Sequence, residues 1–299
     1  MSEVAVRVLV TGGSGLLGRA IMKVFTEINW NVVGTAFSRV GQGLVKCDLT
    51  DSSSVEALIE KEKPDFIIHA AAERAPDAVE NRYEETRKLN VAASGHLAAL
   101  AKRCGSKLIY ISTDYVFDGT SPPYRETDAC NPLNKYGQTK LDGEKAILEE
   151  DPSACVLRVP ILYGPVERVD ESAVTCLLPL LQLKASKKVS HYEKRYPVHV
   201  RDVALILRDL VKAITKDREI KGIFQWSGKE QLTKYDMIVA MSRVLSLPHD
   251  HIAPDPSPAP GAPRSYEARM DSSRLESLGI SYHTDFDVGI KECLTPWVV

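Results

Sequence analysis

A glycine-rich turn near the start of the chain constrains the fold more than any other feature. The apolar run Val6–Val10 leads into TGGSGLLG at Thr11–Gly18, and Leu16–Ile28 then shows helical spacing of its apolar residues. Glycines between a strand and a helix allow a tight turn and a close approach of the backbone to a pyrophosphate, and the helix N-terminus adds amides that favour phosphate. The turn predicts a dinucleotide site that includes Gly12, Ser14, Gly15, Leu16, Leu17 and Gly18.

Strand and helix patterns alternate through the first half of the chain. The expected strands are Asn31–Ala36, Leu44–Cys47, Phe66–Ala70, Lys107–Ser112 and Ala154–Val159. The expected helices are Ser52–Lys61 with Asp51 as its cap, Glu84–Arg103 and Asn134–Glu150. Repeated βαβ units of this kind predict an α/β fold, with a Rossmann-type doubly wound parallel sheet and helices on both faces.

The regular alternation ends at Pro160. Beyond it, the expected helices are Ser172–Leu183, Arg201–Thr215, Thr233–Leu245 and Asp271–Leu278, and the expected strands are Lys188–His191 and Gly222–Trp226. The stretch Pro254–Pro263 holds too many prolines for a helix or a central strand. We therefore expect a dinucleotide-binding Rossmann domain at 1–160 and a smaller C-terminal α/β domain for a substrate or partner at 161–299. Residues near 200–215 are expected to pack back on the Rossmann domain.

The end of the second expected strand indicates which dinucleotide is bound. NAD-binding proteins usually place an acid there for the ribose 2′-hydroxyl. This chain has no acid in that place but carries Phe37, Ser38 and Arg39, and the guanidinium could hold a 2′-phosphate. NADP is therefore favoured over NAD, unless Arg39 is only a solvated surface residue. Asp48 and Leu49 follow the third strand, where the adenine is expected, although Asp48 could instead cap the next helix.

A possible catalytic set lies further along the chain. Tyr136 and Lys140 form a Tyr-x-x-x-Lys pattern on an expected helix, after Thr113 at the end of a strand. The four-residue spacing places the tyrosine and the lysine on one helix face. A nearby ammonium stabilises a tyrosinate, so the phenol can act as a general acid or base closer to neutral pH. Thr113 would hydrogen-bond a substrate carbonyl. The structural alternative is a surface Tyr/Lys pair beside a strand-end threonine.

The overall composition argues against several classes of protein. A net charge of −2 gives no electrostatic reason to expect nucleic acid or an anionic membrane as partner. No apolar run approaches the roughly 18 residues of a membrane span, and the first strand leaves no room for a signal or transit peptide. The 6 cysteines are scattered, without the Cys/His spacing of a zinc site. We expect reduced cysteines, no metal and a cytoplasmic protein.

Several motifs resemble the extended short-chain dehydrogenase/reductase family over nearly the whole chain. The run Ile111–Gly119 (ISTDYVFDG), then Pro123-Tyr124-x-Glu126 and Asn131–Gly137 (NPLNKYG), is similar to one branch of that family. This branch holds the dTDP-4-dehydrorhamnose reductases and the regulatory β subunits of methionine adenosyltransferase. The segments that resemble the β-subunit side of the branch are Ala71–Glu80, His191–Asp202, Phe224–Tyr235 and Gly289–Glu292.

The resemblance implies a site and a function. NADP would contact Ser14–Leu17, Phe37–Arg39, Asp48 and Leu49, with Ala70 and Arg74 along its middle and Tyr136, Lys140 and Leu162 around the nicotinamide. The implied partner is the catalytic subunit of methionine adenosyltransferase, and the implied role is regulation of S-adenosylmethionine synthesis, with Thr113, Tyr136 and Lys140 vestigial. The same three residues permit the alternative, an NADPH-dependent reductase of a nucleotide-linked 4-keto sugar. A third hypothesis is a redox-inert NADP sensor with another partner.

The end of the chain carries a separate expectation. The resemblance implies a C-terminal tail that inserts between subunits of the catalytic enzyme. Here the segment Leu294–Val299 (LTPWVV) is rich in apolar residues. An apolar chain end needs a surface to cover it, so Trp297 either packs into the protein's own core or anchors the partner, as tryptophans at binding hot spots do.

Overall fold

The computed structural model describes residues 6–41, 43–183 and 185–298. Within this part of the chain, seven strands form one parallel sheet in the order β10-β6-β5-β4-β1-β2-β3. The strands are β1 (Arg7–Thr11), β2 (Asn31–Ala36), β3 (Leu44–Lys46), β4 (Phe66–His69), β5 (Lys107–Thr113), β6 (Cys155–Val159) and β10 (Gly222–Gln225). The order reverses between β1 and β4, as in doubly wound sheets, so the predicted Rossmann-type fold is confirmed.

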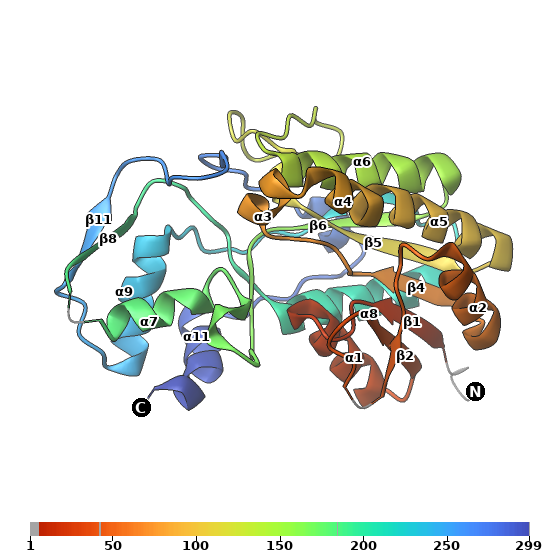
Figure 1. Cartoon of the computed structure of the whole chain (residues 1–299), viewed down its shortest axis with the longest axis horizontal. Helices are drawn as coiled ribbons and strands as arrows, with labels where there is room; N and C mark the ends of the chain where they lie inside the picture. Colours follow the sequence, from red (N-terminus) through yellow and green to blue (C-terminus); the bar gives the residue numbers. More distant parts are fainter. Residues whose placement is uncertain (1–5, 42, 184, 299) are drawn as a thin grey trace.

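Helices cover both faces of this sheet (Figure 1). The helices α1 (Leu16–Glu27) and α8 (Val200–Lys216) share one apolar core with one face, and the helices α2 (Ser52–Glu62), α5 (Ala93–Cys104) and α6 (Lys135–Glu150) line the other. Both α8 and β10 come from beyond residue 160, yet they belong to the layers of the large sheet. The domain division at residue 160 stays a prediction. It already placed residues near 200–215 against the Rossmann domain, whereas it assigned the strand that becomes β10 to the smaller domain.

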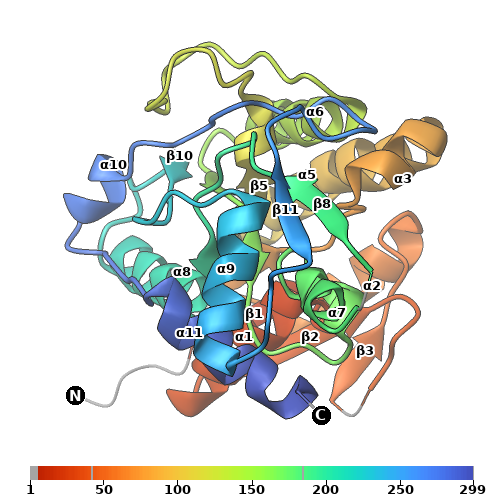
Figure 2. The ribbon, with the colours of Figure 1, turned by 90° about the vertical axis from the view of Figure 1, so that its left-hand side faces the viewer.

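The remaining elements form a smaller unit around a separate core (Figure 2). In it, β8 (Lys187–Ser190) pairs with β11 (Ile252–Asp255), and β7 (Leu162–Tyr163) pairs with β9 (Val198–His199). The helices of the unit include α7 (Leu178–Leu181), α9 (Lys234–Leu245) and α11 (Phe286–Leu294). Pro254 lies in β11, within a two-stranded sheet, where a missing amide is tolerated. The proline-rich stretch thus stays out of the central sheet, as expected.

Three expected helices differ from the structure. The segment expected as one helix at Glu84–Arg103 is α4 (Tyr83–Arg87), then a π-helical turn at Lys88–Ala92, then α5. The expected helix Ser172–Leu183 is wrong: the Ser172 hydroxyl accepts the amides of Val174 and Thr175 and holds a local turn. Only α7 remains α-helical there, after one 3₁₀ turn at Thr175–Leu177.

The last expected helix, Asp271–Leu278, shortens to α10 (Ser273–Glu276). The chain turns at Gly279, whose φ of 74° lies in the left-handed region that favours glycine. The spacing also gives no sign of the short helix α3 (Pro76–Asn81), which has proline in its first turn. Apart from the π-helical turn, these differences fall in short connecting segments, where local hydrogen bonds compete with a regular helix.

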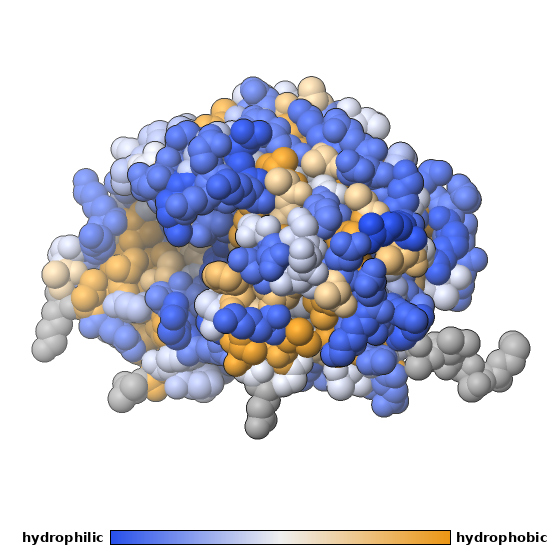
Figure 3. All heavy atoms as spheres, turned by 45° about the vertical axis from the view of Figure 1, so that its right-hand side comes forward, coloured by the Kyte–Doolittle hydropathy of each residue, from blue (hydrophilic) through white to orange (hydrophobic). Residues whose placement is uncertain are grey.

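Two features concern the outside of the molecule: the length of its apolar helices and the polarity of its surface. No helix in the described ranges is long and apolar enough to cross a membrane. The face shown in Figure 3 is mostly hydrophilic, and its apolar side chains gather in a hollow at the left of the view and in a patch at the lower centre.

Candidate functional site

The glycine turn brings β1 and α1 unusually close together. Gly12 has a φ of 72°, and a Cβ on it would lie 2.9 Å from the Cα of Ala71. A Cβ on Gly18 would lie 2.1 Å from the carbonyl oxygen of Gly12, so any side chain there would push α1 off the turn. In the described structure no side chain caps the start of α1, and its first turn carries no acid. The helix N-terminus therefore has the amides and the dipole that bind an anion such as pyrophosphate.

A cavity of about 780 Å³ opens beside this turn. It lies at the carboxyl ends of β1, β4 and β5, where open α/β sheets bind their ligands, and its size is typical of a small-molecule site. Every residue that the sequence analysis places in the site lines this cavity: Gly12, Ser14, Gly15, Leu16, Leu17, Gly18, Phe37, Ser38, Arg39, Asp48, Leu49, Ala70, Arg74, Thr113, Tyr136, Lys140 and Leu162.

The rim near the end of β2 carries an arginine pair and a buried acid. Arg39 is about half exposed, and its Nη1 donates to Oε1 of Glu171 over 3.2 Å. Arg19 on α1 donates to both carboxylate oxygens of Glu171. Burial by itself would raise the pKa of Glu171, but the hydrogen bonds from Arg19, the Glu167 amide and Arg39, together with the charge of Arg19, outweigh it and lower the pKa to about 2. Arg39 is therefore exposed to solvent yet paired with a buried acid, and its contact with a 2′-phosphate stays a prediction.

Asp48 and Asp51, which follow β3, have different roles, and the sequence had left the role of Asp48 open. Asp51 accepts the amides of Ser53 and Ser54, which confirms it as the cap of α2. The Oδ1 atom of Asp48 accepts the amide and the hydroxyl of Thr50 at 2.9 Å and 2.7 Å. Asp48 thus shapes the loop that lines the cavity and does not cap the helix.

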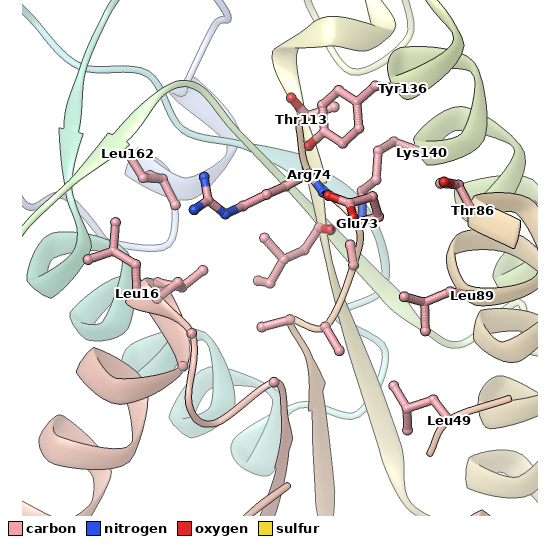
Figure 4. A pocket seen from close by; sticks show the side chains of 18 of the residues that line it. Leu16, Leu49, Glu73, Arg74, Thr86, Leu89, Thr113, Tyr136, Lys140 and Leu162 are labelled. Atoms are coloured by element: carbon pink, nitrogen blue, oxygen red, sulfur yellow. Dashed lines mark hydrogen bonds between the residues drawn. The ribbon is translucent and has the colours of Figure 1, made fainter. Parts of the chain in front are cut away.

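Thr113, Tyr136 and Lys140 meet at one end of the cavity (Figure 4). Thr113 ends β5, and the other two residues lie in the first turns of α6, which begins after its cap Asn134. The ammonium of Lys140 donates to the carbonyl oxygen of Ile111 over 2.7 Å and lies 3.9 Å from the ring centroid of Tyr110. The structural alternative of an exposed pair therefore does not hold, because Lys140 is buried.

The electrostatics of this set differ from expectation. Burial raises the pKa of the Tyr136 phenol above its ordinary value, and a hydrogen bond with Thr113 offsets only part of that shift. Burial also lowers the pKa of Lys140 to about 7. The expectation that Lys140 brings the pKa of Tyr136 towards neutral is wrong here, since desolvation is the larger effect. Tyr136 stays protonated at neutral pH, which suits a proton donor.

A buried polar network supports the loop after β4. The side chain of Asn90, in the π-helical turn, accepts the amide of Glu73 at 3.0 Å and donates to Thr139 on α6 at 3.1 Å. His69 lies between the hydroxyls of Thr11 and Ser94, and burial lowers its pKa to about 3, so it is neutral. Asn90 thereby connects the cavity wall to the helix that carries Tyr136.

Several cavity residues were missed by the sequence analysis. They include Glu73, Thr86, Leu89, Asp114, Tyr115 and Arg195. Arg195 is buried and comes from the smaller unit, where its Nη1 donates to the carbonyl oxygens of Lys194 and Ser265. Asp114 and Tyr115 directly follow Thr113, so closeness to the expected set was the available signal. Arg195 lies in the segment His191–Asp202 that carries the family resemblance, but nothing in its local spacing indicates that it reaches the cavity, because the tertiary fold brings it there.

Together, the sheet order and the cavity at its switch point define a Rossmann-type α/β protein with an extended ligand cleft. The chain belongs to the family described as RmlD substrate binding domain, which matches residues 6–298. It is 50% identical over 295 residues to the methionine adenosyltransferase 2 subunit beta of Bos taurus, an alignment that covers 98% of this chain and 88% of that protein. The resemblance drawn from the motifs is thereby confirmed.

Reductases of the same branch are more distant. The dTDP-4-dehydrorhamnose reductase of Aggregatibacter actinomycetemcomitans is 31% identical over 238 residues, which cover 79% of this chain and 78% of that protein. The solved dTDP-4-dehydrorhamnose reductase of Bacillus anthracis, in complex with NADP, superposes with a TM-score of 0.85 at 22% identity and covers 99% of this chain and 100% of that one. At that identity the superposition establishes the fold alone.

Proposed function

We propose that this chain is an NADP-binding regulatory subunit of a methionine adenosyltransferase and modulates S-adenosylmethionine synthesis. The observation that carries the proposal is the 50% identity, over 98% of the chain, to a protein named as a β subunit of that enzyme. The partner would be the catalytic subunit. A cytoplasmic location accords with the cysteines in the described residues, which are all free thiols.

The residues of the cavity fit NADP. The uncapped start of α1 would hold the pyrophosphate, and Arg39 would contact the 2′-phosphate. Thr113, Tyr136 and Lys140 line the end of the cavity that would take the nicotinamide. NADPH, when bound, supplies a hydride. Whether that hydride is used separates the two candidate functions.

The second candidate is an NADPH-dependent reductase of a nucleotide-linked 4-keto sugar. It is favoured by one observation, the complete set of Thr113, Tyr136 and Lys140 around a single cavity. The protonated phenol of Tyr136 would donate its proton to the carbonyl oxygen, and the Thr113 hydroxyl would orient that oxygen. Lys140 would hold the end of β5 in place through the carbonyl of Ile111.

The decisive experiment measures partner binding and effect together. The chain is mixed with a methionine adenosyltransferase catalytic subunit, complex formation is followed by size exclusion with light scattering, and S-adenosylmethionine synthesis is assayed with and without the chain. We expect a stable complex and a changed rate of synthesis. If no complex forms at micromolar concentrations, the regulatory proposal is wrong. NADPH oxidation with a keto-sugar nucleotide, without any partner, would support the reductase.

The variant Tyr136→Phe distinguishes the two candidate functions by removing a single oxygen atom. A regulatory subunit should keep its partner affinity, because the change removes one hydroxyl inside the cavity. A reductase should lose about 10²–10⁴-fold in turnover, the usual contribution of a general acid. Tyr115→Phe is the matched control, since it removes a second phenol from the same cavity wall. Keto-sugar reduction that Tyr136→Phe abolishes and Tyr115→Phe preserves would overturn the regulatory proposal.

A further inference from the structure

Residues 165–171, here called the acidic strap, lie against the rim of the cavity. The strap leads away from β7 and contains three acids, Glu167, Asp170 and Glu171. Although the strap is at the surface, the side chain of Glu171 is only 5% exposed. Its two carboxylate oxygens accept from Nη1 and Nη2 of Arg19 at 2.8 Å and 2.7 Å. Such two-point contacts are the stronger and more directional kind of ion pair.

Further contacts tie the strap to the cavity wall. The amide of Glu167 donates to Oε2 of Glu171 over 3.0 Å, and the Glu167 carboxylate lies 3.6 Å from Nη1 of Arg39. The guanidinium of Arg74 donates to the carbonyl oxygen of Glu171. Figure 4 shows Arg74 extending across the cavity toward Leu162 and Leu16. The strap is therefore held from the loop after β4, from α1 and from the end of β2.

The contact with Arg39 is the weakest of these. Arg39 is 48% exposed, and its Nη1 lies 3.2 Å from Glu171 and 3.6 Å from Glu167. Ion pairs with an exposed partner contribute little to stability, so this guanidinium can exchange one anion for another. Arg19, by contrast, keeps Glu171 in place at 25% exposure. Glu171 thus remains beside Arg39 whatever else Arg39 binds.

We propose that Glu171 is a specificity-determining residue, a built-in competitor that limits how strongly Arg39 selects NADP over NAD. The inference rests on the proposed cofactor. A phosphate carries about −1.5 to −2 charges, so it outcompetes a carboxylate for Arg39, but it must break the contact between Arg39 and Glu171 and then lie beside the remaining negative charge. NAD has no 2′-phosphate and pays neither cost. By linkage, NADP binding weakens the grip of Arg39 on the strap, whereas NAD binding does not.

The test compares Kd values for NADP and NAD by isothermal titration on the full chain. In Glu171→Gln, we expect the ratio of the NAD Kd to the NADP Kd to rise about threefold or more, in keeping with removal of one partly screened charge. The matched control is Asp170→Asn, which removes a charge from the same turn. That carboxylate is 72% exposed and pairs with Arg168 at 3.0 Å, so its ratio should stay at the wild-type value.

Two further variant comparisons make the test of Glu171 more specific. In an Arg39→Ala background, Glu171→Gln should no longer change the ratio, because the competition acts through Arg39. If Glu171→Gln unfolds, Glu167→Gln at an acid 60% exposed should raise the ratio by a smaller factor. An unchanged ratio in both glutamate variants, or an equal rise in Asp170→Asn, refutes the inference and leaves the proposed cofactor standing. A wild-type chain that binds neither dinucleotide refutes the cofactor itself.

Discussion

Arg39 lies where its positive charge can pair with a single group of a bound ligand. It lies at the end of β2, lines the cavity and is held by Glu171 rather than by a backbone group. Lys140 illustrates the opposite case, a cation that the fold has almost removed from water. The two side chains therefore respond to different variables, Arg39 to the phosphate of a ligand and Lys140 to pH.

Replacing Arg39 should change the choice of cofactor. We expect Arg39→Ala to weaken NADP by about 1 kcal/mol, close to fivefold, and to leave NAD nearly unchanged. The loss is smaller than is usual for a charged hydrogen bond because Arg39 is 48% exposed and already shared with Glu171. Isothermal titration with both dinucleotides measures it. An equal loss for NADP and NAD would contradict the assignment of Arg39 to the 2′-phosphate.

Lys140 should make stability depend on pH. Burial lowers its pKa from 10.5 to about 7, so between these values the unfolded chain holds a proton that the native protein lacks. Stability therefore rises with pH across this window, by at most about 1.4 kcal/mol per pH unit from this group. Lys140→Met removes the effect. In urea unfolding, the free energy of unfolding of the wild type should rise relative to that of the variant between pH 7 and pH 9. A difference that stays constant between the two pH values would contradict this prediction.

Helix α6 and the strands β6 and β10 share a buried ion pair. Arg158 on β6 donates to both carboxylate oxygens of Glu144 on α6, at 2.9 Å and 2.7 Å, and to Gln225 on β10 at 3.2 Å. Both charged side chains are at most 3% exposed. The pair therefore fixes the register between elements that come from both halves of the chain, including the last strand of the sheet.

Breaking this pair should be costly. Arg158→Met leaves the Glu144 carboxylate buried without its partner, and we expect a loss of about 3–5 kcal/mol in unfolding free energy. The double variant Arg158→Met/Glu144→Leu should lose less, since no lone charge remains. Arg103→Met is the control, because the ion pair of Arg103 with Glu56 is exposed and should matter by less than about 1 kcal/mol. A single variant as stable as the control would contradict the argument.

At the scale of the whole molecule, the cavity lies where the large sheet meets the smaller unit. The wall combines the sheet's glycine turn with Leu162, Ala173 and Arg195 from beyond residue 160. The smaller unit has its own core, against which α11 and the last described residues pack. Trp297 and Val298 are partly buried in this core, while Val299 lies outside the described residues. The tail therefore has an internal role, and its contact with a partner stays a prediction.

Replacing Trp297 tests directly whether the tail stabilises the core of the smaller unit. We expect Trp297→Ala to reduce the unfolding free energy by about 1–2 kcal/mol, less than for a fully buried aromatic side chain, because the ring is only partly covered. Chemical denaturation measures this change, and affinity for the catalytic subunit is measured on the same variant. A loss of affinity of at least tenfold with unchanged stability would instead assign Trp297 to the partner interface.

The sequence by itself determined the Rossmann-type sheet and the main groups of the cavity wall, from the glycine turn to Thr113, Tyr136 and Lys140. The sheet, the glycine turn and the Thr113, Tyr136 and Lys140 set follow from local rules: apolar runs that end in glycine, helical spacing, and polar residues at the carboxyl ends of strands. Ala70, Arg74 and Leu162 came from the family resemblance. Only the tertiary structure decided that β10 joins the large sheet, that Asn90 lies in a π-helical turn, and that Arg195 reaches the cavity. It also decided that Glu171 meets Arg39 from 132 residues away. Such contacts depend on how distant segments pack, and local spacing carries no record of that packing.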